Sequence, residues 1–238
     1  MVKNINSFAH QKFNYQGTKI MPYKQFVSRV LGFAMLTISP VAFSATAVEE
    51  GKQIFDMNCM ACHQADAIGK AGFAPSLTNK ELLSVASDKF FMSTIRDGRQ
   101  GTGMPPFAHL GKKKIKKIVA YLRSHEKLPN RSKEIDAQRE SYGDSRKGEL
   151  WFTQICENCH GVNGEGYGAG VAGPAIGKPG FLNQVSDGFL RETIKNGRSN
   201  TRMRGFAGPS GLANLRDSEV DDLIAFLRSL KTSSRTQR

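Results

Sequence analysis

The pentapeptide Cys59-Met60-Ala61-Cys62-His63 recurs later in the chain as Cys156-Glu157-Asn158-Cys159-His160, and the two copies use all four cysteines. A Cys-x-x-Cys pair alone is also typical of a structural disulfide, a zinc site or a thioredoxin-like redox motif. A histidine directly after each pair is the attachment signature of a c-type haem, to which the cysteines form thioethers and the histidine gives a nitrogen ligand. The sequence predicts two covalent haem c groups, held by Cys59, Cys62, Cys156 and Cys159, with His63 and His160 as iron ligands.

The rest of the chain repeats in register around the two motifs. The matching pairs are Gly51 and Gly148, Phe55 and Phe152, Pro75 and Pro174, Arg99 and Arg198, Met104 and Met203, and Phe107 and Phe206. A register kept over this length indicates a tandem duplication. We expect cytochrome domains over residues 48–128 and 147–231, a polar linker over residues 129–146, and a disordered tail over residues 232–238.

Both domains are predicted to be all-α. Apolar residues at 115, 118, 119 and 122, and again at 220, 223, 224 and 227, follow the spacing of an amphipathic helix that ends each domain. A shorter helix is expected to lead into each haem motif, over residues 50–58 and 146–157. The apolar residues of a domain this small would barely form a core on their own. We therefore expect each domain to wrap around its haem, which supplies the missing apolar mass.

Residues 1–47 are predicted to be a secretory signal peptide, since five cations and no anion accompany an apolar run that ends in small residues. Cleavage after Ser44 or after Ala47 satisfies the small-x-small rule, and Met21 is an alternative translation start. An uncleaved membrane anchor is the rival interpretation, but the run is shorter than about 20 residues and contains Pro40. A periplasmic location follows from export.

The charge of the chain favours acidic partners. The full chain carries +13, and without the five leader cations 29 Lys and Arg face 21 Asp and Glu, which leaves +8. No nucleic-acid motif accompanies this charge, so a protein redox partner, or peripheral contact with an anionic membrane, is the better inference. The start of the last helix contrasts between the domains: it holds Lys112, Lys113, Lys114, Lys116 and Lys117 in domain one, and Asp217, Glu219, Asp221 and Asp222 in domain two. We hypothesise that domain one docks the acidic partner.

Both halves resemble class I cytochrome c domains, and the whole resembles the two-domain, di-haem class I cytochromes c of bacterial respiratory chains. The resemblance implies that a glycine and an aromatic residue of the first helix cross an aromatic residue of the last helix. The matching residues are Gly51, Phe55 and Tyr121 in domain one, and Gly148, Phe152 and Phe226 in domain two. It also implies that the carbonyls of Pro75 and Pro174 accept from Nδ1 of the ligand histidines, a bond that would fix each imidazole.

The sixth iron ligands are expected to be Met104 and Met203. Met104 lies in Gly101-Thr102-Gly103-Met104-Pro105-Pro106-Phe107, which is similar to the distal methionine loop of the family, although methionine more often fills a core. Met57, Met60, Met92 and His109 compete with it in domain one. Met203 is the only methionine after Met104, with Lys178 and Lys195 as outsiders. Its neighbours are Arg202 and Arg204 in place of prolines, so the ligation in domain two stays open.

Arg99 and Arg198 either pair with haem propionates or cap the distal loops, whereas His109 and His125 are expected at the surface. Two His/Met irons would leave no open coordination position, so we expect an electron-transfer protein and not an enzyme. A catalytic di-haem enzyme is one alternative. An electron-accepting subunit of a dehydrogenase or terminal oxidase is another, because a fold and a haem motif do not specify a partner.

Overall fold

The computed structural model describes residues 46–233, which belong to one compact unit. Most of the expected signal peptide, and the tail beyond Ser233, therefore lie outside the described residues. The described part is helical, with isolated bridges and no strand, which confirms the all-α prediction. None of its helices is both long and apolar enough to span a bilayer.

Each helix of the first half has a counterpart in the second half. The first set is α1 (Ala47–Asn58), α2 (Met60–His63), α3 (Lys80–Val85), α4 (Asp88–Asp97) and α5 (Gly111–Arg123). The second set is α7 (Ser145–Ile155), α8 (Glu157–His160), α9 (Pro179–Leu182), α10 (Asp187–Asn196) and α11 (Asp217–Ser233). The helix α6 (Ser132–Asp136) lies between the sets, and the 3₁₀ turns are η1 (Ala65–Ala67), η2 (Ala108–Leu110) and η3 (Gly166–Ala169). The repeat seen in the sequence is thus a repeat of structure.

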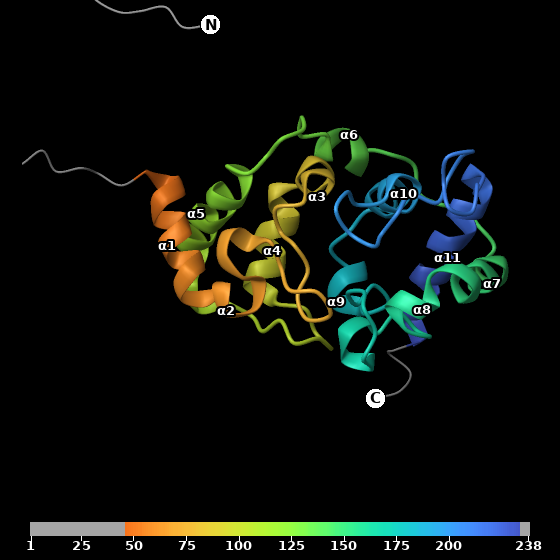
Figure 1. Cartoon of the computed structure of the whole chain (residues 1–238), viewed down its shortest axis with the longest axis horizontal. Helices are drawn as coiled ribbons and strands as arrows, with labels where there is room; N and C mark the ends of the chain where they lie inside the picture. Colours follow the sequence, from red (N-terminus) through yellow and green to blue (C-terminus); the bar gives the residue numbers. More distant parts are fainter. Residues whose placement is uncertain (1–45, 234–238) are drawn as a thin grey trace, which may run out of the picture. The chain divides into compact units, whose positions relative to one another are not determined.

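The first and last helices of each half, α1 with α5 and α7 with α11, pack against each other (Figure 1). A glycine lies at each crossing, as the resemblance implied. A Cβ on Gly51 would overlap the carbonyl oxygen of Lys117, and a Cβ on Gly148 would overlap that of Asp222. Next to each crossing, aromatic rings pack together. The ring centroids of Phe55 and Tyr121 are 5.3 Å apart, and those of Phe152 and Phe226 are 5.1 Å apart. This close crossing fixes the helix from which each haem motif continues.

The helices α4 and α10 begin and end in the same way. Ser87 and Ser186 are their N-caps and accept from the backbone N–H of Phe90 and Phe189. Gly98 and Gly197 end them at φ of 67° and 69°, a left-handed conformation that suits glycine. The chain therefore leaves both helices in the same direction, toward the loops that hold Met104 and Met203.

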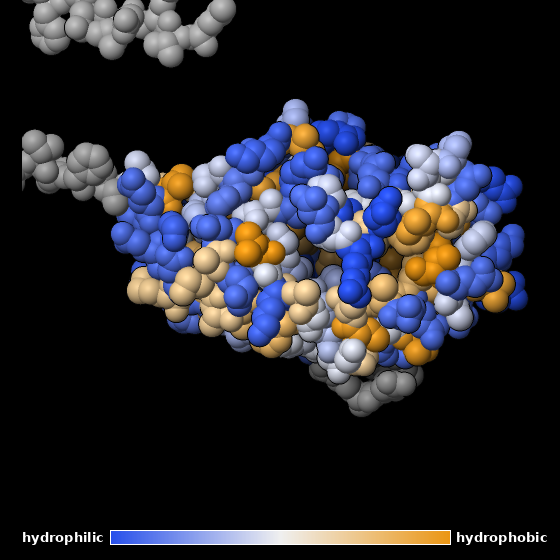
Figure 2. Space-filling view, viewed as in Figure 1, coloured by the Kyte–Doolittle hydropathy of each residue, from blue (hydrophilic) through white to orange (hydrophobic). Residues whose placement is uncertain are grey.

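The segment over residues 129–146 packs against helices of both halves. Ile135 in α6 is fully buried, and a Cβ on Gly188 of α10 would overlap its carbonyl oxygen. On the other side, the hydroxyl of Ser84 donates to the carbonyl of Pro129 at 2.7 Å, and Arg131 N–H donates to the carbonyl of Ser84 at 2.7 Å. The expected polar linker thus contains an apolar anchor. Hydrophilic side chains dominate the face drawn in Figure 2, where apolar ones form small groups.

Candidate haem sites

Each cysteine motif starts where the first helix of its half ends. Cys59 and Cys156 are the C-caps of α1 and α7, and one further helical turn, α2 or α8, ends on the histidine. Within that turn, the backbone N–H of His63 donates to the carbonyl of Cys59 at 2.9 Å, and His160 does the same to Cys156 at 2.9 Å. Residues three apart share a helix face, so both thiols of a motif lie on one side.

The cysteines of each motif are not joined in disulfides, so both remain available for covalent attachment. Burial, reinforced by the second cysteine of the motif, raises the pKa of Cys59 to about 11 and that of Cys156 to about 12. Before haem attachment, these two thiols are therefore protonated at neutral pH. Within residues 46–233, no group of three or more His, Cys, Asp or Glu residues could hold a metal ion.

Both histidines are buried and held in one orientation. Nδ1 of His63 donates to the carbonyl of Pro75 at 3.0 Å, and Nδ1 of His160 donates to that of Pro174 at 2.9 Å. Burial lowers the pKa of both imidazoles, and the proline carbonyls offset this only in part. Each ring is therefore neutral at pH 7. Among the described hydrogen bonds only Nδ1 is engaged, which leaves Nε2 as a free nitrogen donor.

Several large apolar side chains near each motif in the sequence are exposed. Near the first motif they are Met57, Met60, Ile68 and Phe73, and near the second they are Leu150 and Val162. A haem has a broad apolar ring, two vinyl groups for the thiols and an iron for the imidazole. The residues present fit it.

The two distal loops have the same hydrogen bonds, although only the first contains prolines. Arg99 N–H donates to the carbonyl of Met104 at 3.0 Å, and Arg198 N–H donates to that of Met203 at 2.6 Å. A threonine braces each loop from within. The hydroxyl of Thr102 donates to Arg99 and accepts from Met104, at 2.8 and 3.2 Å, and Thr201 makes the equivalent bonds at 2.8 and 3.0 Å. Met104 and Met203, both half-buried, therefore occupy equivalent positions.

The competing ligands are not placed equivalently in the two halves. Met92 packs against the core from α4, and Met57 is exposed. His109 lies beside Phe107 at a ring distance of 5.9 Å, and His125 packs edge-on against Tyr121 at 5.0 Å. Lys195 pairs with Asp217 at 2.7 Å. Among these candidates, only the two methionines share a common local geometry.

Arg99 and Arg198 cap the distal loops with their backbones, while their side chains pack on aromatic rings. The Arg99 guanidinium lies 5.0 Å from the ring centroids of both Phe90 and Phe181. Arg198 lies 5.5 Å from the centroid of Phe189. Burial lowers the pKa of both guanidinium groups to about 10. Sequence reasoning did not find the aromatic partners, although Phe90 and Phe189 are also matched in the repeat.

The fold and the two sites define a tandem c-type cytochrome, and comparisons with known proteins agree. The model of the family "Cytochrome C oxidase, cbb3-type, subunit III" matches residues 46–122, and that of the family "Cytochrome c" matches residues 145–231. The chain is a two-domain, di-haem class I cytochrome c. It carries two covalently bound haem c groups.

Similar proteins come from several bacteria. The cbb3-type cytochrome c oxidase subunit CcoP of Rubrivivax gelatinosus is 28% identical over 218 residues, which are 89% of this chain and 62% of that protein. Subunit FixP of Bradyrhizobium sp. (strain ORS 278) is 30% identical over 170 residues, 65% of this chain and 53% of that protein. This chain thus spans little more than half the length of such relatives. A chain of a Kuenenia stuttgartiensis reducing HAO-like protein complex aligns at a TM-score of 0.48 and 18% identity, covering 79% of this chain and 97% of that one.

Proposed function

We propose that this protein is an exported cytochrome that passes electrons toward a terminal oxidase through two His/Met-ligated haems. Cys59 and Cys62 hold the first haem and Cys156 and Cys159 the second. His63 and His160 give the proximal nitrogens, and Met104 and Met203 give the distal sulfurs. The observation that carries this proposal is the repetition, bond for bond, of both the His–Pro pair and the distal methionine loop.

The bound iron supplies a one-electron couple, and the side chains decide how it is used. The proline carbonyls orient the imidazoles and increase their basicity. A soft thioether opposite a histidine favours ferrous iron and so a comparatively high potential. If His63 with Met104 and His160 with Met203 held the two irons, no coordination position would be left for a small substrate, which would disfavour a catalytic di-haem enzyme.

Similar proteins support an oxidase as the electron acceptor, because they are subunits of cbb3-type cytochrome c oxidases. They favour a subunit of such a complex over a free shuttle. The lysines that begin α5 offer a contact surface for the partner. Lys112, Lys113, Lys114 and Lys116 are exposed and make no salt bridge within residues 46–233, whereas Lys117 pairs with Glu50.

Cofactor content tests the attachment sites. The mature protein should carry two haems per chain that survive acid–acetone extraction. Cys59→Ser and Cys156→Ser should each lower the covalent haem content to about one per chain, with the other domain keeping its spectrum. Recovery of a single haem from the unmutated protein in a host that matures c-type cytochromes would refute the proposal.

Co-purification tests the oxidase. Affinity isolation of the tagged cytochrome from gently solubilised membranes should recover oxygen-reducing activity, and the same isolation after a high-salt wash should report how much of the contact is electrostatic. Isolation of the cytochrome without any oxidase, together with fast electron exchange with a soluble carrier, would instead support a free shuttle.

A further inference from the structure

The two distal loops differ in what stiffens them. The first loop has Pro105 and Pro106 directly after its methionine, and each proline fixes its own φ angle. The second loop has Arg204 and Gly205 at the equivalent places, and both leave the backbone freer. Yet the second loop has the same internal hydrogen bonds as the first. Some other contact must compensate for the missing prolines.

That contact comes from the other domain. Ser199, which follows Arg198 in the second loop, makes three hydrogen bonds to residues at the start of α3 in the first half. Its backbone N–H and its hydroxyl both donate to Oε2 of Glu81, at 3.1 and 2.9 Å. Its carbonyl accepts from Nδ2 of Asn79 at 2.9 Å. Both the backbone N–H and the backbone C=O of Ser199 are thus hydrogen-bonded to domain one.

The groups that hold Ser199 are themselves fixed. Asn79 is the N-cap of α3 and accepts from the backbone N–H of Leu82 at 3.0 Å, so its side chain is engaged at both ends. Burial disfavours the charged form of Glu81, but the bonds from Ser199 and the neighbouring Lys80 outweigh it and lower the pKa of this carboxyl. Glu81 is therefore ionised at neutral pH, and its bonds to Ser199 are charge-assisted, about twice as strong as neutral ones.

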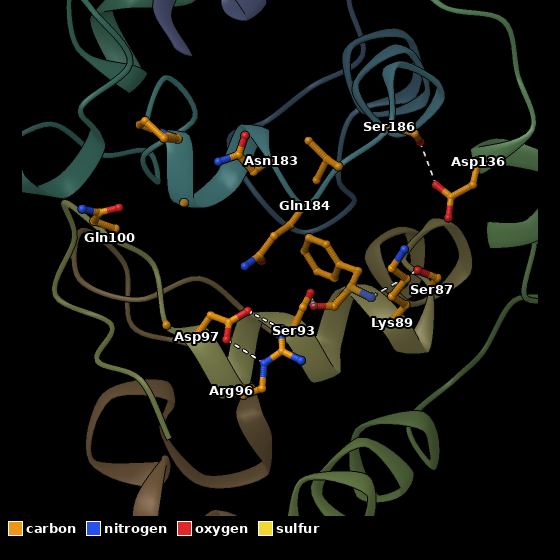
Figure 3. A pocket seen from close by; sticks show the side chains of 15 residues that line it. Ser87, Lys89, Ser93, Arg96, Asp97, Gln100, Asp136, Asn183, Gln184 and Ser186 are labelled. Atoms are coloured by element: carbon orange, nitrogen blue, oxygen red, sulfur yellow. Dashed lines mark hydrogen bonds and ion pairs between the residues drawn. The ribbon is translucent and has the colours of Figure 1, made fainter. Parts of the chain in front are cut away.

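The first loop meets domain two through a different contact, since the guanidinium of Arg99 donates to the carbonyl of Gly180 at 3.3 Å. Gln100 occupies the position that Ser199 holds in the second half, and among the described residues its side chain makes no hydrogen bond. It lines a polar cavity of about 680 Å³ between α4 and the segment that contains Asn183 and Gln184 (Figure 3). Gly180, the counterpart of Glu81 in the repeat, offers the first loop only its backbone carbonyl. Among the described residues, a carboxylate from the other domain holds only the second loop, where the prolines are missing.

We propose that Glu81 and Asn79 of domain one are positioning residues for Met203, the distal ligand of the haem in domain two. This inference rests on the proposed ligation by Met203. Domain one thus completes the axial site of its neighbour, so domain two expressed alone lacks part of the support for its distal loop. The axial bond in domain two depends on the carboxylate and amide of domain one, whereas the loop of domain one has its own prolines as well.

The test reads each axial bond separately in the holoprotein. In reduced His/Met haems, the ring current shifts the methyl resonance of the ligand methionine far upfield, and Met104→Ala and Met203→Ala assign the two resonances. Glu81→Ala should shift or broaden the Met203 resonance and lower the potential of that haem, and should leave the Met104 resonance in place. Glu81→Gln keeps one acceptor oxygen and should give a smaller change, which guards against loss of fold in the alanine variant.

Glu50→Ala is the matched control, because it removes a carboxylate that pairs with Lys117 inside domain one. It should leave both methionine resonances unchanged. Loss of a resonance in Met203→Ala would support Met203 as the iron ligand. If Glu81→Ala and Glu81→Gln then leave that resonance and the potential unchanged, Glu81 does not position Met203. If Met203→Ala removes no upfield methyl resonance, the ligation itself is wrong and the bracing falls with it.

Discussion

Phe90 and Phe189, which occupy equivalent positions in the two repeats, stack on each other with their ring centroids 5.4 Å apart and their planes 26° apart. Arg99 and Arg198, equivalent to each other as well, lie over these two rings. The hydroxyl of Thr94 also donates to Gln184 at 2.6 Å, across the same contact. The domains therefore meet through corresponding surfaces, and the distal loops leave from the edge of this contact.

Replacement of the stacked ring should weaken the contact between the domains. Phe90 is buried, so Phe90→Ala removes apolar contacts on both sides and should cost about 3 kcal/mol of unfolding free energy. Calorimetry is expected to show a lower melting temperature and separate transitions for the two domains. Phe90→Leu keeps most of the volume and should lose less than half as much. A single unshifted transition in Phe90→Ala would contradict a stabilising role for the stack.

Asp221 should be the most sensitive acidic residue of domain two. Its carboxylate is buried and accepts from Arg139 at 2.6 Å, Arg191 at 2.9 Å and Ser141 at 3.0 Å. Asp221→Asn removes the negative charge that the half-buried Arg191 faces, and should cost about 3 kcal/mol in chemical denaturation. Asp217→Asn is the control, since the exposed pair with Lys195 should contribute less than about 1 kcal/mol. Equal effects of the two variants would refute this difference.

At low pH, protonation of Glu81 should weaken the hydrogen bonds that hold the second distal loop. The pKa of this carboxyl is lowered from 4.5 in the folded protein, so its contribution is complete above about pH 4.5 and is lost as the pH falls through the lower folded value. The charges that face it are Lys80 and Arg198, which stay protonated in this range. In an acid titration, the Met203 resonance should therefore be lost at a higher pH than the Met104 resonance. Loss of both at one pH would indicate global unfolding instead.

The lysines of α5 should speed association with an acidic partner. Changing Lys112, Lys113 and Lys116 to Gln should lower the bimolecular rate of electron transfer several-fold at low salt, and the difference should shrink toward 0.15 M salt, where charges are screened beyond about 8 Å. Stopped-flow mixing with the oxidase measures it. Changing Lys127, Lys133 and Lys147 to Gln removes the same net charge elsewhere on the surface, because these lysines are also exposed. This second variant is the control for net charge. A rate that both variants lower equally would show that net charge matters and the patch does not.

The acidic residues that begin α11 do not form a matching free surface. Asp217 pairs with Lys195, Glu219 pairs with Arg216, and Asp222 accepts from the backbone N–H of Asp144 at 2.7 Å. Asp221 is itself buried and pairs with Arg139 and Arg191. The charge contrast between the domains is therefore carried mainly by Lys112, Lys113, Lys114 and Lys116 of α5, which have no such partners within the described part of the chain.

The exported protein should begin at Ala45. Thr46 is the N-cap of α1 and forms a capping box with Glu49, whose backbone N–H donates to the threonine hydroxyl at 3.2 Å. Cleavage after Ser44 keeps this cap, whereas cleavage after Ala47 removes it at a cost of about 1 kcal/mol. N-terminal sequencing of the periplasmic protein decides between them. A mature protein that begins at Val48 would show that the cap is not retained.

Much of this protein follows from local sequence. A haem motif is contiguous, so Cys59 to His63 and Cys156 to His160 identify the cofactor without any fold. The repeat extends that inference, because Pro75 and Pro174 or Met104 and Met203 support each other by register. The helices before each motif and at the end of each domain are equally visible, since their apolar spacing has the period of a helix.

The contact between the domains was decided only by the tertiary structure. Ser199 and Glu81 are 118 residues apart, and nothing in the local sequence of either one indicates a hydrogen bond between them. The same holds for Ile135, an apolar residue in a polar segment that proves to be buried against α10. Such pairings depend on how completed helices pack, and packing depends on the shapes of whole surfaces rather than on periodicity along the chain. The sequence determined which groups each haem requires, and the packing of the two domains determined what holds the second distal loop in place.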